Sequence, residues 1–264
     1  MKPKKALLVI SFGTSHRDTR VRTIEAIEED LKREFPDRVF YRAWTSSFLR
    51  KKVQQEGYGV CSVQQALETI CNDGISDLLV QPTHMLCGKE YVDARREILA
   101  FQDRFSRLAV GRPLMEDGQD VRIFADTLES LIPVSAEQEV VAWMGHGSPQ
   151  SEMNVYDLLN RQFLKDGHPE ICVGTVEWEP GITPVLEQIR RRAPRRVILS
   201  PMLVVAGDHA KNDMAGDDPD SWKNQIAAEH TEVECLGKGL GEYPAVRKLY
   251  LDHARCPELI VPGK

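Results

Sequence analysis

Two kinds of hydrophobic pattern alternate along the whole chain. Short apolar runs predict buried strands, and segments with apolar residues three or four positions apart predict amphipathic helices. Strands alternating with helices indicate βαβ units and parallel sheets. The pattern predicts strands over residues 5–12, 38–44, 77–81, 108–110, 139–144, 170–176, 196–200 and 233–235. It predicts helices over residues 17–35, 48–55, 63–71, 90–105, 121–131, 151–163, 181–192, 220–228 and 243–255.

This pattern occurs twice. Residues 77–90 align with residues 196–209 without a gap, so that strand, proline, apolar segment and glycine coincide and Glu90 falls on His209. Residues 8–15 match residues 141–148 in the same order of strand, glycine and hydroxyl. Two matches in the same order predict an internal duplication.

The duplication predicts an α/β fold of two similar Rossmann-like domains, each with a parallel sheet flanked by helices. We expect the domains at residues 1–133 and 134–264, joined near residues 132–135, with the metal site in the second and the last helix packing back on the first. Two such domains facing each other would form a cleft, with Glu90 on one wall and His209 on the other.

Composition narrows the class of protein. The 264 residues carry a net charge of −6, which argues against nonspecific nucleic-acid binding but allows an anionic ligand at a local basic cluster. Apolar runs fall short of the roughly 20 residues of a membrane span, and the first is too short for a signal peptide, so we expect a cytoplasmic protein without membrane association. Six scattered cysteines without a Cys-x-x-Cys pair predict reduced thiols.

Three candidate metal ligands follow predicted strands of the second half. His146 stands between two glycines, Glu177 ends an apolar strand, and His209 follows an apolar segment that stops at Gly207. Neighbouring parallel strands lie about 4.8 Å apart, and ligands bind at their carboxyl ends, so these side chains can converge. Two imidazoles and a carboxylate suit a borderline divalent ion such as Co, Ni, Fe or Zn.

Several motifs resemble the anaerobic cobalt chelatases of vitamin B12 synthesis, the CbiK type. They include Gly145-His146-Gly147, Val176-Glu177 and the segment 203–214, together with the segments 6–15, 88–91, 217–223 and 239–245. The resemblance implies the type II chelatase fold, in which two α/β domains are related by pseudo-twofold symmetry. It implies insertion of Co²⁺ into sirohydrochlorin, with His146, Glu177 and His209 holding the metal, His146 also accepting a proton, and Glu90 as a further cleft acid.

The substrate of such an enzyme carries eight carboxylates, so the rim of the site should supply hydroxyls, amides and cations. The candidates for substrate binding are Ser11, Thr14, Ser15, His84, Ser148 and Lys89, with Arg17, Lys51, Lys52 and Lys211 as further cations. Backbone amides of Thr14, Ser15 and Ser148 at helix starts are expected to bind carboxylates. We expect a homo-oligomer. We also expect no haem, because the relatives that bind haem are exported and this sequence shows no export signal.

Three alternatives remain at this point. The same site could insert Fe²⁺ or Ni²⁺, because the affinity order of divalent metals does not favour cobalt. A two-lobed protein could bind tetrapyrrole or metal without catalysis, although a second, base-like imidazole at His146 argues against it. A nucleotide-binding oxidoreductase fits the fold class but lacks the Gly-x-Gly-x-x-Gly fingerprint after the first strand.

Overall fold

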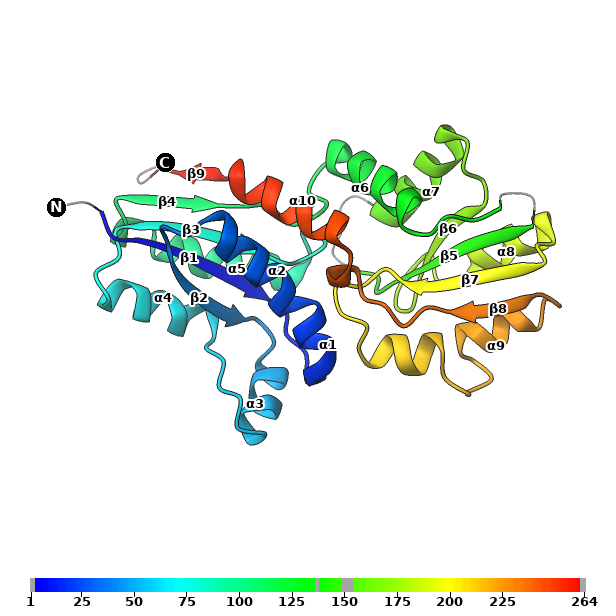
Figure 1. Cartoon of the computed structure of the whole chain (residues 1–264), viewed down its shortest axis with the longest axis horizontal. Helices are drawn as coiled ribbons and strands as arrows, with labels where there is room; N and C mark the ends of the chain where they lie inside the picture. The colour runs from blue at the N-terminus through cyan, green and yellow to red at the C-terminus, as the bar shows by residue number, and fades with distance from the viewer. Residues whose placement is uncertain (1–2, 136–137, 149–153, 262–264) are drawn as a thin grey trace. The chain divides into compact units, whose positions relative to one another are not determined.

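The chain divides into two units, each built around its own sheet (Figure 1). A computed structural model describes residues 3–135, 138–148 and 154–261. Unit 1 comprises Met1–Glu116 and Pro244–Lys264, and unit 2 comprises Asp117–Tyr243. The first division therefore falls before α6 (Gly118–Leu131) and not at residue 133, because α6 packs against α7 (Val155–Asp166) of unit 2.

Unit 1 has a five-stranded sheet of order β2-β1-β3-β4-β9. The strands are β1 (Lys5–Ser11), β2 (Val39–Trp44), β3 (Asp77–Pro82), β4 (Arg107–Val110) and β9 (Glu258–Ile260). The first four pair in parallel, as the sequence pattern predicts, but β9 pairs antiparallel with β4. The sequence analysis missed β9, since three residues are too few to display a period.

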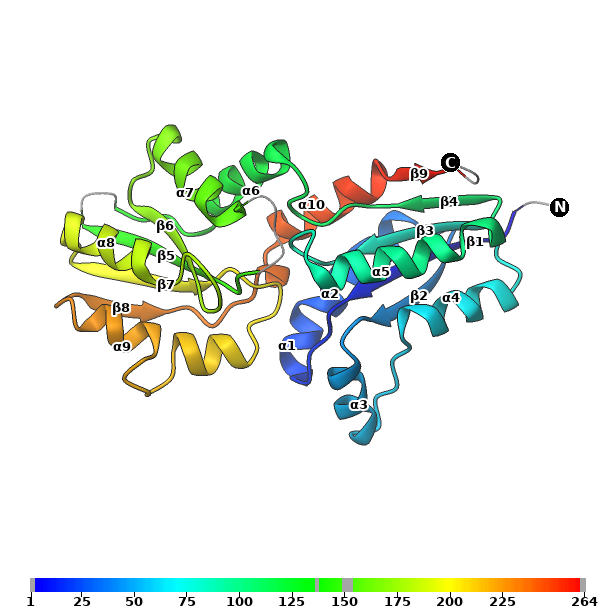
Figure 2. The ribbon, with the colours of Figure 1, turned by 180° about the vertical axis from the view of Figure 1, so that it is seen from behind.

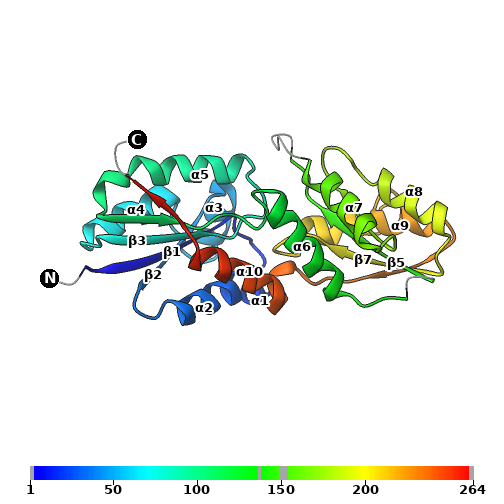
Figure 3. The ribbon, with the colours of Figure 1, turned by 90° about the horizontal axis from the view of Figure 1, so that it is seen from above.

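Helices cover both faces of this sheet (Figure 3). They are α1 (Arg17–Arg22), α2 (Ile24–Glu34), α3 (Ser47–Gln55), α4 (Val63–Asn72), α5 (Lys89–Ala100) and α10 (Pro244–Arg255), with a 3-10 turn η1 (Gln102–Arg104). Alternate β1 residues Ala6, Leu8 and Ile10 form a core with α4 and α5. Strand residues alternate between faces, so Leu7 and Val9 face the side on which α2 and α10 pack.

Unit 2 has a four-stranded parallel sheet of order β6-β5-β7-β8. The strands are β5 (Glu139–Gly145), β6 (Ile171–Thr175), β7 (Arg196–Pro201) and β8 (Glu232–Cys235). The further helical segments are α8 (Thr183–Arg192), a π-helical turn η2 (Ala210–Met214), α9 (Trp222–Ala227) and a 3-10 turn η3 (Leu240–Glu242). One core joins β5 to α8 and α9 and includes Ala142, Val185 and Trp222.

The two sheets repeat each other in order and in register. The order β2-β1-β3-β4 of unit 1 corresponds to β6-β5-β7-β8 of unit 2. Pairing of β1 with β3 runs from Lys5 and Asp77 to Ile10 and Pro82, and pairing of β5 with β7 runs from Glu139 and Arg196 to Met144 and Pro201. With Pro82 placed on Pro201, as in the ungapped match of residues 77–90 with 196–209, these registers place Ile10 on Met144. The sequence match of residues 8–15 with 141–148 is therefore displaced by one residue from the structural correspondence. The structure therefore supports the internal duplication that the sequence predicts.

The predicted helices differ from the observed ones mainly at their ends. The helix expected over residues 17–35 is broken at Thr23, whose backbone leaves the helical region and whose hydroxyl donates to the Thr19 carbonyl. A hydroxyl that bonds the preceding turn competes with regular helix geometry. The helix expected over residues 151–163 is observed as α7 from Val155, and residues 151–153 lie outside the described part of the chain.

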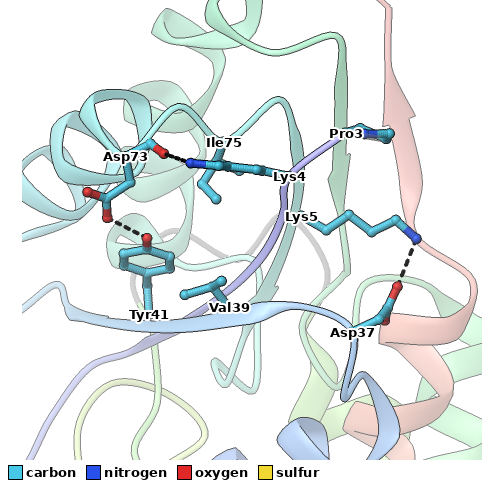
Figure 4. A pocket seen from close by; sticks show the side chains of 8 residues that line it. All are labelled: Pro3, Lys4, Lys5, Asp37, Val39, Tyr41, Asp73 and Ile75. Atoms are coloured by element: carbon cyan, nitrogen blue, oxygen red, sulfur yellow. Dashed lines mark hydrogen bonds and ion pairs between the residues drawn. The ribbon is translucent and has the colours of Figure 1, made fainter. Parts of the chain in front are cut away.

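A hollow at the amino end of β1 and β2 carries no evident chemistry (Figure 4). Its charged groups are already paired: Lys5 with Asp37, Lys4 with the Asp73 carbonyl, and the Tyr41 hydroxyl with the Asp73 carboxylate. It also lies at the edge opposite the carboxyl ends of the strands, where open α/β sheets bind their ligands. Figure 2 shows the elements of both units from behind.

Among the residues that the structure describes, helices long and apolar enough to cross a membrane are absent.

The returning helix α10 supplies a test of the fold. Tyr250 is fully buried, and its hydroxyl donates to the Thr83 carbonyl at the end of β3, 2.8 Å away. We expect Tyr250→Phe to lower the free energy of unfolding by about 1–3 kcal/mol, because a buried carbonyl loses its donor. Urea unfolding followed by circular dichroism measures this.

Tyr41→Phe is the matched control, since its hydroxyl bonds Asp73 at the surface. We expect a change below about 1 kcal/mol for it. Equal effects of the two variants would contradict the structural role given to Tyr250.

Candidate metal site

Unit 2 brings the three predicted metal ligands together. His146 directly follows β5, Glu177 lies two residues after β6, and His209 follows β7 by eight residues. Each offers a ligand atom, and these atoms all lie within 4.8 Å of one another. The two imidazole rings meet edge to face with centroids 4.9 Å apart. Neighbouring strands in the order β6-β5-β7 thus deliver two nitrogens and a carboxylate to one point.

Backbone pairing fixes the first two ligands side by side. The ladder between β5 and β6 continues beyond both strands, because Val176 N–H donates to the Gly145 carbonyl and Glu177 N–H to the His146 carbonyl, each at 2.9 Å. Gly147 permits this approach: its φ is +92°, and a Cβ there would lie 1.7 Å from the Glu177 carbonyl oxygen. Its N–H donates to the buried Tyr156 hydroxyl at 2.9 Å. Any residue other than glycine at position 147 would place its Cβ against the Glu177 carbonyl and separate the two loops.

A short helical segment presents the third ligand. Met202 N–H donates to the Met144 carbonyl, which holds the chain beside β5 immediately after β7. Leu203 and Val204 then accept hydrogen bonds from Leu240 and Gly241. This frame leads to His209 and η2, where His209 Nδ1 lies 2.7 Å from Asp213 Oδ2. Short π-helical turns are often found at functional sites.

Hydrogen bonds set the tautomer of both imidazoles. A carboxylate only accepts, so His209 Nδ1 carries the proton that binds Asp213. A carbonyl also only accepts, so His146 Nδ1 donates to the Gly147 carbonyl at 3.1 Å. In the neutral rings, both Nε2 atoms are then left with lone pairs. Outer partners of this kind orient metal-binding histidines and fix their tautomer.

The distances suit a divalent ion. His146 Nε2 and Glu177 Oε2 are 4.0 Å apart, and bonds of about 2.0–2.2 Å to a common ion span this gap at a wide angle between the two ligands. About half of the His146 and Glu177 side chains is exposed, so coordination positions remain open to water or substrate. The arrangement can therefore hold a cation reversibly and yield it to a stronger ligand set.

A second group of acids, Asp126, Glu129 and Asp166, also lies within metal-binding distance. Its charge is already balanced in part, because His168 lies 3.5 Å from Glu129 and 2.9 Å from Glu170. The Glu170 hydrogen bond raises the pKa of His168, which favours the cationic imidazolium there. We assign no function to this group.

The corresponding positions of unit 1 carry other residues. Phe12 follows β1 as His146 follows β5, and Ser46 lies two residues after β2 as Glu177 does after β6. Glu90 stands in the first turn of α5, two residues after Gly88, as His209 stands two residues after Gly207. The repeat therefore retains one acid in unit 1, and the two-histidine set belongs to unit 2.

The hydroxyls expected to bind substrate in unit 1 have internal contacts. Ser11 is buried and accepts a hydrogen bond from the Thr83 hydroxyl at 2.9 Å. Thr14 is also buried, and its Oγ1 accepts from the His16 N–H. Ser15 is half-buried and lies just before His16, the N-cap of α1. In unit 2, Ser148 is half-buried, and α7 begins only at Val155 with Asn154 as its cap, so Ser148 is not at this helix start.

His84 and Lys89 differ from simple rim groups. Both ring nitrogens of His84 are shielded from solvent and lack a hydrogen-bond partner among the described residues. Burial lowers the pKa of His84 to about 4, so its ring is neutral at pH 7 and offers no charge to a carboxylate. Lys89 is exposed but pairs with Asp93 one turn along α5. The substrate-binding roles of these residues stay predictions.

The sequence analysis assigned no role to Asp213 and Tyr156. The spacing of four residues between His209 and Asp213 was visible, and on a helical turn it places the two side chains on one face. Tyr156 left no such signal, because its contact with Gly147 depends on how α7 packs against β5.

Gly147 gives a direct test of the site's geometry. We expect Gly147→Ala to weaken Co²⁺ binding by more than about tenfold, since the new methyl group must push Glu177 away from His146. Isothermal titration calorimetry with Co²⁺ alone measures the affinity. Gly167→Ala is the control, because Gly167 also has a positive φ, +87°, but its Cβ would meet nothing within 4 Å. Equal losses in both variants would contradict the geometric explanation.

Asp213 gives a second test. We expect Asp213→Ala to weaken Co²⁺ binding about 10–100-fold, because the imidazole of His209 loses its orienting acceptor. Asp213→Asn should recover part of the loss, since its amide oxygen still accepts. Asp217→Ala removes a nearby exposed acid that pairs with Lys223 and should leave the affinity unchanged. If Asp217→Ala lost as much Co²⁺ affinity as Asp213→Ala, the effect would come from the net charge and not from the contact with His209.

Comparison with known proteins identifies the family of this chain. The sirohydrochlorin cobaltochelatase of Salmonella typhimurium is 37% identical over 251 residues, covering 95% of each chain. The sirohydrochlorin cobaltochelatase CbiKC of Nitratidesulfovibrio vulgaris is 28% identical, covering 95% of this chain and 89% of the relative. The solved structure of SirB from Bacillus subtilis with Fe³⁺ has a TM-score of 0.66 at 17% identity and covers 96% of this chain and 94% of SirB, which supports the fold. The sequence model of the cobalt chelatase (CbiK) family matches residues 5–256, and this chain belongs to that family.

Proposed function

We propose that this protein inserts Co²⁺ into sirohydrochlorin, giving cobalt-sirohydrochlorin and two protons in the anaerobic synthesis of cobalamin. The observation that carries the proposal is the convergence of His146, Glu177 and His209 within 4.8 Å in a chain of the cobalt chelatase family. Two relatives that align with about 95% of this chain are sirohydrochlorin cobaltochelatases.

The first step is binding of the ion. The Nε2 atoms of His146 and His209 and the carboxylate of Glu177 replace part of the water shell of Co²⁺. Because these side chains are 37–49% exposed, further positions stay with water. A site with two imidazoles and one carboxylate accepts cobalt but does not enclose it. The ring nitrogens of the substrate can then displace the remaining water.

The second step transfers the ion to the ring and two protons to the protein. As the four ring nitrogens take the ion, His146 Nε2 is released with its lone pair and accepts one pyrrole proton. The resulting imidazolium keeps its Nδ1–H on the Gly147 carbonyl and has Glu177 Oε2 4.0 Å from Nε2. His209 accepts the second proton, with the Asp213 carboxylate stabilising its charge. Neutral imidazole suits this exchange near neutral pH.

Glu90 remains the predicted acid for passing protons outward. It is exposed in the first turn of α5 of unit 1, at the position that corresponds to His209 in the repeat.

Replacing His146 tests the catalytic proposal. We expect His146→Ala to lower the rate of Co²⁺ insertion by about 10²–10⁴-fold, because the site loses a metal ligand and a proton acceptor together. Binding of metal-free sirohydrochlorin should largely survive. The absorbance change of the tetrapyrrole on metallation measures the rate, and a titration without metal measures binding.

His230→Asn is the control, since His230 is an exposed histidine of unit 2 and asparagine tolerates its positive φ of 61°. It should insert cobalt at the rate of the unchanged protein. If His146→Ala also turned over at that rate, the catalytic role would be wrong. If the unchanged protein bound sirohydrochlorin without inserting cobalt, the protein would be a tetrapyrrole carrier and not an enzyme.

A further inference from the structure

Three large aromatic side chains are exposed among the described residues, and all three follow the carboxyl ends of strands. Phe12 directly follows β1, Phe48 follows β2 by four residues, and Trp178 follows β6 by three. Ligands of open α/β sheets bind at this edge. Exposed aromatic side chains confined to a ligand-binding edge indicate a partner with an apolar surface.

Trp178 stands out because its backbone is held in an unfavourable conformation. Its φ is +63°, a left-handed region that bulky residues rarely adopt. Two hydrogen bonds of the Thr175 hydroxyl fix the turn. It donates to the Trp178 carbonyl at 2.7 Å and accepts from the Gly181 N–H at 2.9 Å. The indole is nevertheless 58% exposed, while Trp44, Trp143 and Trp222 are at most 4% exposed. Packing within unit 2 therefore does not explain why a tryptophan occupies this turn.

The place of Trp178 in the chain connects it with the metal site. It directly follows Glu177, whose N–H is bound to the His146 carbonyl and whose carboxylate lies with the two imidazoles. A tetrapyrrole centred on an ion at these ligands must extend past them on every side. An exposed side chain next to a ligand, such as that of Trp178, is therefore within the range of the ring system.

From these observations we propose that the indole of Trp178 packs against the apolar face of the tetrapyrrole and orients the ring over the metal ligands. The inference rests on the proposed function, because it takes sirohydrochlorin as the occupant. An indole is well suited to such a contact, because it offers a large flat surface with little conformational freedom to lose. Phe48 repeats the feature in unit 1, where it follows β2, the strand that corresponds to β6.

The test separates ring binding from metal binding. We expect Trp178→Ala to raise the Kd for metal-free sirohydrochlorin about tenfold, the loss typical of an aromatic stacking contact. KM for the tetrapyrrole should rise in parallel, with kcat changed less than about twofold. Trp178→Phe should recover most of the affinity. The Kd for Co²⁺ alone should stay unchanged in both variants, because Glu177 and the histidines remain.

Leu164→Ala is the matched control. Leu164 is 56% exposed on unit 2, near the end of α7, which precedes the amino end of β6. It should leave the Kd for sirohydrochlorin unchanged. The proposal is overturned if Trp178→Ala binds the tetrapyrrole as the unchanged protein does, if Leu164→Ala loses as much, or if Trp178→Ala loses Co²⁺ affinity.

The outcomes also separate this inference from the proposed function. If the unchanged protein inserts cobalt and Trp178→Ala has normal tetrapyrrole binding, the inference alone fails. If the tetrapyrrole binds with a dependence on Trp178 but cobalt is not inserted, the proposed function alone fails.

Discussion

The site depends on backbone pairing between β5 and β6 that continues past the ends of both strands. Hydrogen bonds to the Gly145 and His146 carbonyls place Glu177 beside His146, and Gly147 lets the two loops touch. The pairing of β5 with β7 brings the chain toward His209 from the other side. The positions of His146 and Glu177 therefore follow from hydrogen bonds that continue the sheet, whereas His209 is positioned by the segment after β7 and by η2. A frame of this kind allows exposed side chains to be held without burying the cation.

The chemistry of the site follows from what lies behind each imidazole. A carbonyl behind His146 and a carboxylate behind His209 keep both Nδ1 atoms protonated and both Nε2 atoms available. In the proposed reaction, the same acceptors would stabilise an imidazolium once the ion has left. One arrangement of hydrogen bonds would then serve metal binding before transfer and proton binding after it. Because the side chains of the three candidate ligands are partly exposed, an ion bound there would not be enclosed.

The duplication explains why one unit carries the metal ligands. The two sheets share strand order and register, so corresponding side chains reach corresponding places at the carboxyl edge. At those places unit 2 has His146, Glu177 and His209, whereas unit 1 has Phe12, Ser46 and Glu90. A shared frame with different side chains therefore gives the two units different chemistry at corresponding places.

The sequence by itself determined most of the elements and the repeat, and it predicted the three candidate metal ligands, because hydrophobic periods and abrupt polar strand ends are local signals. Runs such as 139–144 and 196–200 reveal buried strands. His146 follows the first run, His209 follows the apolar segment that stops at Gly207, and both mark the candidate site. Only the tertiary structure decided which unit α6 joins, the antiparallel β9, the support that Tyr156 and Asp213 give to the site, and the burial of the His84 ring nitrogens. Each of these depends on packing between segments distant in the chain or on the conformation of a single turn, and hydrophobic periodicity along the chain specifies neither.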